Sequence, residues 1–166
     1  DRLLKVVGEL SLVAGAPGLV GGQVVDLECE GKQVDLETLE YIHLHKTGAL
    51  LKACVITGAL IGGADDAQLD GLRTYARGIG LAFQIVDDIL DVTASSDVLG
   101  KTAGKDLIAD KTTYPKLLGL EESRQRAKTL IQEAKGSLAA FTHSGAGAGQ
   151  EAPLLALADY VIGRDR

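Results

Sequence analysis

Apolar residues recur at helical spacing along almost the whole chain, and this pattern restricts the fold more than any other feature. Alternating strand patterns are rare, and no Asn-Gly or Asp-Gly pair separates two β-branched runs. Polar or glycine-rich residues 95–113 and 144–149 are expected to form loops. We therefore expect one all-α domain over residues 1–166, a helical bundle. The spacing predicts its helices over residues 1–14, 19–30, 38–60, 65–92, a short piece from 114, 121–142 and 151–163.

Composition and charge narrow the class of protein. The 166 residues are 46% hydrophobic and 24% charged, as in an ordered domain that can bury a core. The net charge of −6 argues against a protein that coats nucleic acid. Because the sequence shows no apolar run of 18 residues and no basic leader, we expect no membrane span and a cytoplasmic location. Cys29 and Cys54 lie in apolar-periodic stretches and are expected to be buried thiols.

The segment 81–91, Leu-Ala-Phe-Gln-Ile-Val-Asp-Asp-Ile-Leu-Asp, is the most informative about function. Its polar residues are Gln84, Asp87, Asp88 and Asp91. On a helix they fall in one sector roughly 100° wide, and the other directions are apolar. Carboxylates this close repel one another, so a largely buried helix must place a cation beside them. Mg²⁺ suits one or two carboxylates that share it with phosphate oxygens. A solvated acidic face is the alternative, which the apolar neighbours disfavour.

A second acidic cluster, Asp65, Asp66 and Asp70, follows a pair of glycines at the expected start of a helix. Acidic residues at this position cap a helix and suit its dipole, so we interpret the cluster as a capping feature. His43 and His45 diverge on a helix and are expected to be surface or packed residues, not joint metal ligands.

Lysines provide candidate partners for the carboxylates and for phosphate. Lys46 lies on a largely apolar helix face, so it is expected to point into the interior or a cavity and to need an anionic partner. A lysine whose charge reaches solvent is the alternative. The loop after the aspartates carries Lys101, Lys105 and Lys111 among glycines. Next to a carboxylate stripe, this loop favours a site for a metal and phosphate over a merely solvated loop.

Five motifs follow one another along the chain and support a family resemblance. They are Gly21-Gly22-Gln23-Val24-Val25-Asp26-Leu27, His45-Lys46-Thr47-Gly48, Phe83-Gln84-Ile85-Val86-Asp87-Asp88-Ile89-Leu90-Asp91, Gly100-Lys101 through Gly104-Lys105-Asp106, and Lys111-Thr112-Thr113-Tyr114-Pro115. Together they resemble the C-terminal half of the trans-prenyl diphosphate synthases, most of all the bacterial farnesyl diphosphate synthase type. The resemblance implies an all-helical bundle with a central cavity and a homodimer. It also implies Mg²⁺-assisted condensation of an allylic diphosphate, dimethylallyl or geranyl, with isopentenyl diphosphate.

The resemblance also implies roles for individual residues. Asp87 would bind magnesium directly, with Asp88 and Asp91 in or near its coordination shell. Gln84 and Thr47 would face the allylic carbocation.

Other residues would bind the substrates or support the site by the same resemblance. Lys46 and Lys101 would hold the allylic diphosphate. The remaining polar residues of the motifs would bind substrate (Gln23, Lys105) or support the site (Asp26, Asp106), and Arg164 and Arg166 would belong to a basic tail that closes over it.

The chain also departs from the family's pattern. The first aspartate-rich motif, with its paired arginines, is absent, and so is the segment that would bind isopentenyl diphosphate. We therefore expect that these 166 residues alone do not turn over substrate. Two alternatives stay open. The first is a non-catalytic synthase-like helical subunit, which the residues preceding Asp1 would distinguish from the enzyme. The second, less favoured, is a terpene cyclase. The motif that would set product chain length is missing.

Overall fold

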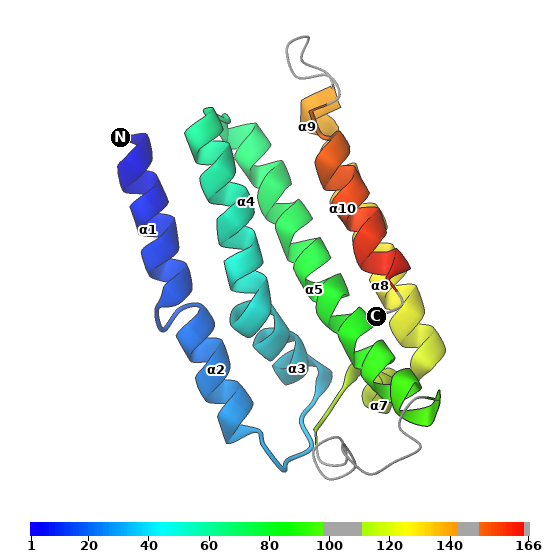
Figure 1. The fold of residues 1–166 in the computed structure, drawn as a ribbon. Coiled ribbons are helices and arrows are strands. Elements are labelled where there is room, and N and C mark those ends of the chain that lie inside the picture. The colour runs from blue at the N-terminus through cyan, green and yellow to red at the C-terminus, as the bar shows by residue number, and fades with distance from the viewer. Residues whose placement is uncertain (98–110, 143–149, 165–166) are drawn as a thin grey trace.

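The computed structural model describes residues 1–97, 111–142 and 150–164, and these residues form helices and connections without a strand (Figure 1). The all-α expectation is therefore confirmed. The elements are α1 (Arg2–Ala14), α2 (Leu19–Glu28), α3 (Leu36–His43), the π-helical turn η1 (Leu44–Gly48), α4 (Ala49–Gly62), α5 (Asp66–Asp97), α7 (Tyr114–Leu118), α8 (Leu120–Gly136), α9 (Ala139–Thr142) and α10 (Ala152–Gly163).

The helices run up and down beside one another, with α5 in the middle (Figure 1). On one side, α4 packs against α5, and α1 packs against α4. On the other side, α8 and α10 both contact α5 and each other. The segment from α3 through η1 to α4 runs back along α1 and α2, which brings η1 against both α2 and α5.

Helix α5 is the core helix because most of its directions are apolar, as the sequence predicts. Its buried apolar side chains are Leu69, Leu72, Tyr75, Ala76, Ile79, Leu81, Ala82, Ile85, Val86 and Ile89. Phe83 and Leu90 are partly buried and pack against the same core. Burying this much apolar surface on one helix is the main stabilising contribution of the fold.

Side-chain hydrogen bonds cap the starts of α3 and α5. The Asp35 carboxylate accepts from the Thr38 backbone N–H at 2.8 Å at the start of α3. At the start of α5, Asp65 Oδ1 accepts from the Gln68 N–H at 2.8 Å, and Gln68 Oε1 accepts from the Asp65 N–H at 3.0 Å. This reciprocal pair is a capping box, so the acidic cluster near Asp65 caps the helix as expected.

Four local expectations were wrong. Helix α5 continues to Asp97, into the expected loop. The expected helix 121–142 is broken after Gly136, where Ser137 Oγ donates to the Gly71 carbonyl of α5 at 2.9 Å and turns the chain. The expected continuous helix 38–60 contains η1. Neither cysteine is buried: Cys29 is half-buried and Cys54 is exposed.

The first helix leaves its apolar side uncovered. Leu3 and Leu4 are each 74% exposed, and Val7 and Leu12 are also exposed. By length and composition, the stretches Arg2–Glu28 and Leu36–Gly62 could cross a membrane, but core helices of soluble proteins meet the same test. The expected absence of a membrane span therefore stays a prediction.

Candidate functional site

The outward side of α5 carries Asp87, whose carboxylate is held on both oxygens. Gln84, one turn earlier, donates from Nε2 to Asp87 Oδ2 at 3.3 Å. Arg164, which follows α10, donates from its guanidinium to Asp87 Oδ1 and also to the Phe83 carbonyl at 2.8 Å. The Asp87 side chain is still 40% exposed, so a ligand can reach it.

Asp91 lies one turn further along the same face and is exposed. Partial burial, followed by the charges of Asp87 and Asp88, raises the pKa of the Asp91 carboxyl, and the charge of Lys111 opposes this shift. The carboxylate therefore lies where negative charge is unfavourable and where a further cation would be stabilising.

Asp88 faces the interior of the bundle, although helical spacing places it in one sector with Asp87 and Asp91. The residue is 6% exposed, and its Oδ2 accepts from the Tyr114 backbone N–H at 2.9 Å. The same oxygen lies 3.2 Å from Nε2 of the buried His43, and since a carboxylate only accepts, the imidazole is the donor. Asp88 thus joins α3, α5 and α7 from inside. Its predicted metal role stays untested, but its environment is that of a positioning residue.

A second buried network continues from Tyr114. Its ring stacks on His43 with centroids 5.8 Å apart, and its hydroxyl donates to Glu40 Oε1 at 2.7 Å. Arg126 of α8 donates to the same oxygen at 3.2 Å. Burial and the Glu40 carboxylate raise the pKa of the Tyr114 phenol, so it stays a protonated donor. Sequence reasoning missed this role for His43, although a histidine beside the apolar Leu39 and Ile42 signals a buried group that needs a partner.

Lys46 has the anionic partner that its sequence context requires. Its Nζ lies 2.5 Å from Asp26 Oδ2. The supporting role of Asp26 that the resemblance implies stays a prediction. The ammonium retains part of its exposure, with the side chain 36% accessible. Because an ammonium has three donors, this pair leaves Lys46 able to contact a further anion.

The π-helical turn that carries Lys46 and Thr47 is fixed by close helix packing. A Cβ at Gly22 of α2 would lie 2.4 Å from the Lys46 backbone nitrogen. A Cβ at Gly80 of α5 would lie 3.1 Å from Gly48 Cα. Gly80 therefore allows α5 to pack closely against η1. Helices α2 and α5 therefore both pack closely against η1. Single π-helical turns occur often at functional sites.

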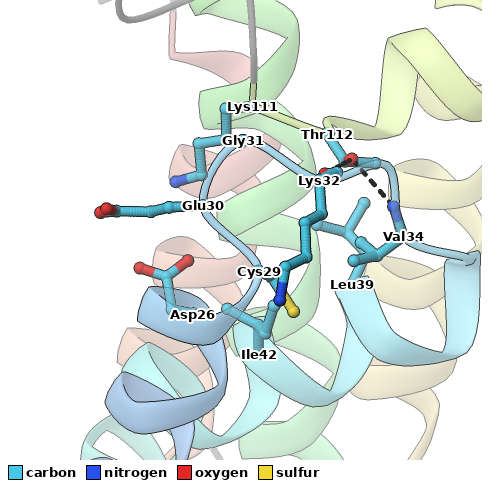
Figure 2. Close-up of a pocket in the computed structure, with 10 residues that line it drawn as sticks. All are labelled: Asp26, Cys29, Glu30, Gly31, Lys32, Val34, Leu39, Ile42, Lys111 and Thr112. Atoms are coloured by element: carbon cyan, nitrogen blue, oxygen red, sulfur yellow. Dashed lines mark hydrogen bonds between the residues drawn. The ribbon is translucent and has the colours of Figure 1, made fainter.

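A pocket of about 420 Å³ opens beside Asp26, the partner of Lys46. It lies between the end of α2, the loop before α3 and the segment before α7 (Figure 2). Its lining includes Asp26, Glu30, Lys32 and Lys111. Thr112 closes the pocket by accepting from the Val34 N–H at 3.2 Å, the bond drawn in Figure 2. Lys111 also lines the pocket, and its charge partly offsets the rise in the pKa of Asp91.

The structure does not describe every predicted site residue. Lys101, Lys105, Asp106 and Arg166 lie outside the described residues. Gln23 and Thr47 are half-buried, on α2 and η1 respectively.

The donor chemistry fits a shared magnesium ion better than a complete protein cage. Among the described residues, no group of three or more His, Cys, Asp or Glu side chains could hold a metal. Asp87 and Asp91 nevertheless offer carboxylates one turn apart, and burial and the neighbouring carboxylates raise the pKa of Asp91. Magnesium characteristically takes only one or two carboxylates and completes its shell with water and phosphate oxygens.

Sequence comparison relates the whole chain to prenyltransferases. The profile of the family described as polyprenyl synthetase matches residues 3–143. The dimethylallyltranstransferase of Fischerella ambigua (strain UTEX 1903) is 58% identical over 165 residues, covering 99% of this chain and 46% of that protein. The chloroplastic geranylgeranyl pyrophosphate synthase of Catharanthus roseus is 57% identical over 99% of this chain and 45% of that protein. The chain thus spans about half the length of the curated relatives it matches.

Solved structures agree with this relationship. A putative farnesyl-diphosphate synthase from Marinomonas sp. MED121 has a TM-score of 0.80 and 38% identity, covering 97% of this chain and 52% of that one. A Helicobacter pylori geranyltransferase, complexed with magnesium and isoprenyl diphosphate, has a TM-score of 0.72 and 31% identity over 97% of this chain and 50% of that one. The products named for these proteins differ, so the similarity does not select the farnesyl type. The chain belongs to the polyprenyl synthetase family.

Proposed function

We propose that this chain supplies the half of a prenyltransferase site that binds magnesium and releases diphosphate. The reaction would join an allylic diphosphate, dimethylallyl or geranyl, to isopentenyl diphosphate. The observation that carries the proposal is the outward face of α5, where Asp87 and Asp91 present carboxylates one turn apart.

The cations of the site would stabilise the departing diphosphate. Magnesium, when bound, would neutralise charge that develops on the phosphate oxygens as the allylic C–O bond breaks. Asp87 and Asp91 would hold it. Lys46 would donate to the diphosphate while Asp26 keeps its ammonium in place, and Lys111 would add positive charge from above the pocket.

Two further side chains would act on the organic part of the substrate. Gln84 and Thr47 have neutral oxygen atoms that carry partial negative charge, and these would stabilise the allylic carbocation without capturing it as a carboxylate could. Asp88 would hold the aspartate helix in register from inside.

Magnesium binding tests the proposal without requiring turnover. We expect the chain to bind Mg²⁺ together with inorganic diphosphate in isothermal titration calorimetry. Asp87→Asn should weaken this binding by at least about tenfold, since it removes a charged ligand. The exposed Asp66 at the start of the same helix provides the matched control, and Asp66→Asn should bind as the parent does. Equal binding by all three proteins would reject the site.

A condensation assay tests the expectation for the isolated chain. Geranyl and isopentenyl diphosphates with Mg²⁺ should give no product, because the chain lacks the first aspartate-rich motif and its arginines. Mg²⁺-dependent product from the purified 166-residue chain would contradict this expectation.

A further inference from the structure

Arg164 makes a set of contacts that concentrates its charge on the aspartate face. Its guanidinium pairs with Asp87 Oδ1, donates to the Phe83 carbonyl at 2.8 Å, and lies over the Phe83 ring with Cζ 3.8 Å from the centroid. The Arg164 side chain is only 10% exposed. A cation therefore already lies at the carboxylate that the proposed function assigns to magnesium.

These contacts leave Arg164 incompletely satisfied. Its Nε is buried without a hydrogen-bond partner among the described residues. A buried donor without a partner is unfavourable, and the Asp87 side of the pair remains open to solvent. The unsatisfied Nε lowers the net stabilisation that the Arg164–Asp87 pair provides, and this makes replacement of Arg164 by a competing cation less costly.

The fold limits how much of the chain must move when Arg164 leaves. Helix α10 is anchored upstream, where the Tyr75 hydroxyl donates to the Leu154 carbonyl at 2.6 Å. Ala158 and Val161 are buried in the core. At the helix end, the Arg164 N–H donates to the Tyr160 carbonyl at 3.1 Å. Release of Arg164 therefore requires rearrangement of only the end of α10.

We propose that Arg164 is a stand-in cation for Asp87, and that a divalent metal binds there by displacing it. The proposal rests on the proposed metal role of Asp87. Its consequence is that metal loading and the conformation of the C-terminal end of α10 are coupled, since one carboxylate oxygen cannot satisfy both cations equally. By thermodynamic linkage, each cation weakens the binding of the other at this carboxylate.

Mn²⁺ binding followed by electron paramagnetic resonance tests the competition, with inorganic diphosphate present at fixed concentration. Arg164→Gln should bind Mn²⁺ about fivefold more tightly than the parent, as expected for loss of a partly exposed ion pair. Arg164→Met, which keeps the length that packs on Phe83, should bind equally tightly. Arg164→Lys retains the charge and should stay near the parent value. Circular dichroism identifies which variants are folded, and the Met variant stands in if the Gln variant is not.

Hydrogen exchange gives a second, independent measurement. Saturating Mn²⁺ should accelerate exchange of the Arg164 amide in the parent protein and leave the upstream part of α10 unchanged. Unchanged exchange, or Mn²⁺ affinities in the Gln and Met variants no tighter than the parent's, would overturn the stand-in role.

Asp87→Asn separates that failure from failure of the proposed function. If Asp87→Asn weakens Mn²⁺ binding while the arginine variants do not tighten it, the metal site stands and only the competition is wrong. If Asp87→Asn leaves Mn²⁺ binding unchanged, or if none of the proteins binds Mn²⁺, the metal assignment fails and the stand-in role fails with it.

Discussion

Asp87 and Asp88 are neighbours in sequence but belong to two different regions of the molecule. The inner region, around Asp88, consists of His43, Tyr114 and Glu40, and its hydrogen bonds join α3, α5 and α7. The outer region contains Asp87, whose partner Arg164 comes from the end of the chain and leaves the carboxylate 40% exposed. The inner carboxylate is buried and accepts two hydrogen bonds on Oδ2, whereas the outer one remains open to a ligand.

The difference shows how one helix can be both a core element and a binding surface. The outer face of α5 carries the carboxylates that a cation can reach. The inner network fixes the position of α5, because Asp88 is hydrogen-bonded to a backbone N–H and to a buried imidazole. We interpret Asp88 as the residue that fixes the position of Asp87, and stability measurements can separate the two roles.

Replacing each aspartate by alanine should give the largest contrast. Asp88→Ala leaves the Tyr114 N–H and His43 without an acceptor inside the protein, so we expect a loss of about 3 kcal/mol in the free energy of unfolding. Asp87→Ala should cost less than about 1 kcal/mol, because the Asp87 side chain is 40% exposed and Arg164 keeps its hydrogen bond to the Phe83 carbonyl. Urea denaturation of both variants, in chelator, provides the measurement. Equal losses would mean that the two regions do not differ as described.

A smaller loss of stability is expected when the Tyr114 hydroxyl, which links the inner network to Glu40, is removed. Tyr114→Phe removes the hydroxyl that donates to Glu40 but keeps the ring against His43 and the backbone N–H that bonds Asp88. Glu40 keeps Arg126, so the loss should be about 1 kcal/mol. The same urea titration measures it, and Mg²⁺ affinity with diphosphate should stay within about twofold of the parent. A larger drop in affinity would place Tyr114 in the binding site itself.

The course of α5 could be predicted from the sequence, but the division between the two regions could not. Helical spacing places Asp87 and Asp88 in one sector because adjacent residues differ by about 100° around the axis. Asp87 and Asp88 lie at opposite edges of this sector, and the local sequence does not say which of them faces α3 and α7. The Tyr114 N–H that captures Asp88 lies 26 residues away, so its approach is decided by packing.

The other missed features have the same physical origin. The π-turn depends on the close approach of Gly22 from α2 and Gly80 from α5, and neither helix is adjacent to η1 in sequence. Arg164 reaches Asp87 across 77 residues. In contrast, the caps at Asp35 and Asp65 involve partners three residues away, and the capping role of the cluster at Asp65 was predicted correctly. Local hydrogen bonding was readable from the sequence, whereas contacts between helices were not.

The smallest expected change in stability is at Asp91, and it tests whether this residue shares a cation with Asp87 in the outer region. Burial and the charges of Asp87 and Asp88 raise the folded-state pKa of Asp91 above 3.8, its ordinary value. The folded protein therefore binds this proton more tightly than the unfolded chain, so the unfavourable contribution of Asp91 appears as pH rises through the interval between the two pKa values. Asp91→Asn should accordingly raise the free energy of unfolding at pH 7 by less than about 1 kcal/mol in chelator, because the residue is exposed.

The gain from Asp91→Asn should shrink as the pH falls from 7 into the acidic range where the parent carboxyl takes up its proton. With saturating Mg²⁺ and diphosphate at pH 7, the Asp91→Asn variant should instead be less stable than the parent. The parent then gains stability from binding the ligand, and an asparagine at position 91 cannot match this gain. Urea titrations across this pH range, with and without Mg²⁺ and diphosphate, provide both comparisons. A gain that is independent of pH would mean that the variant acts through packing. A gain that persists in Mg²⁺ would mean that the charge on Asp91 is not used to hold a cation, and the outer region would then rest on Asp87 alone.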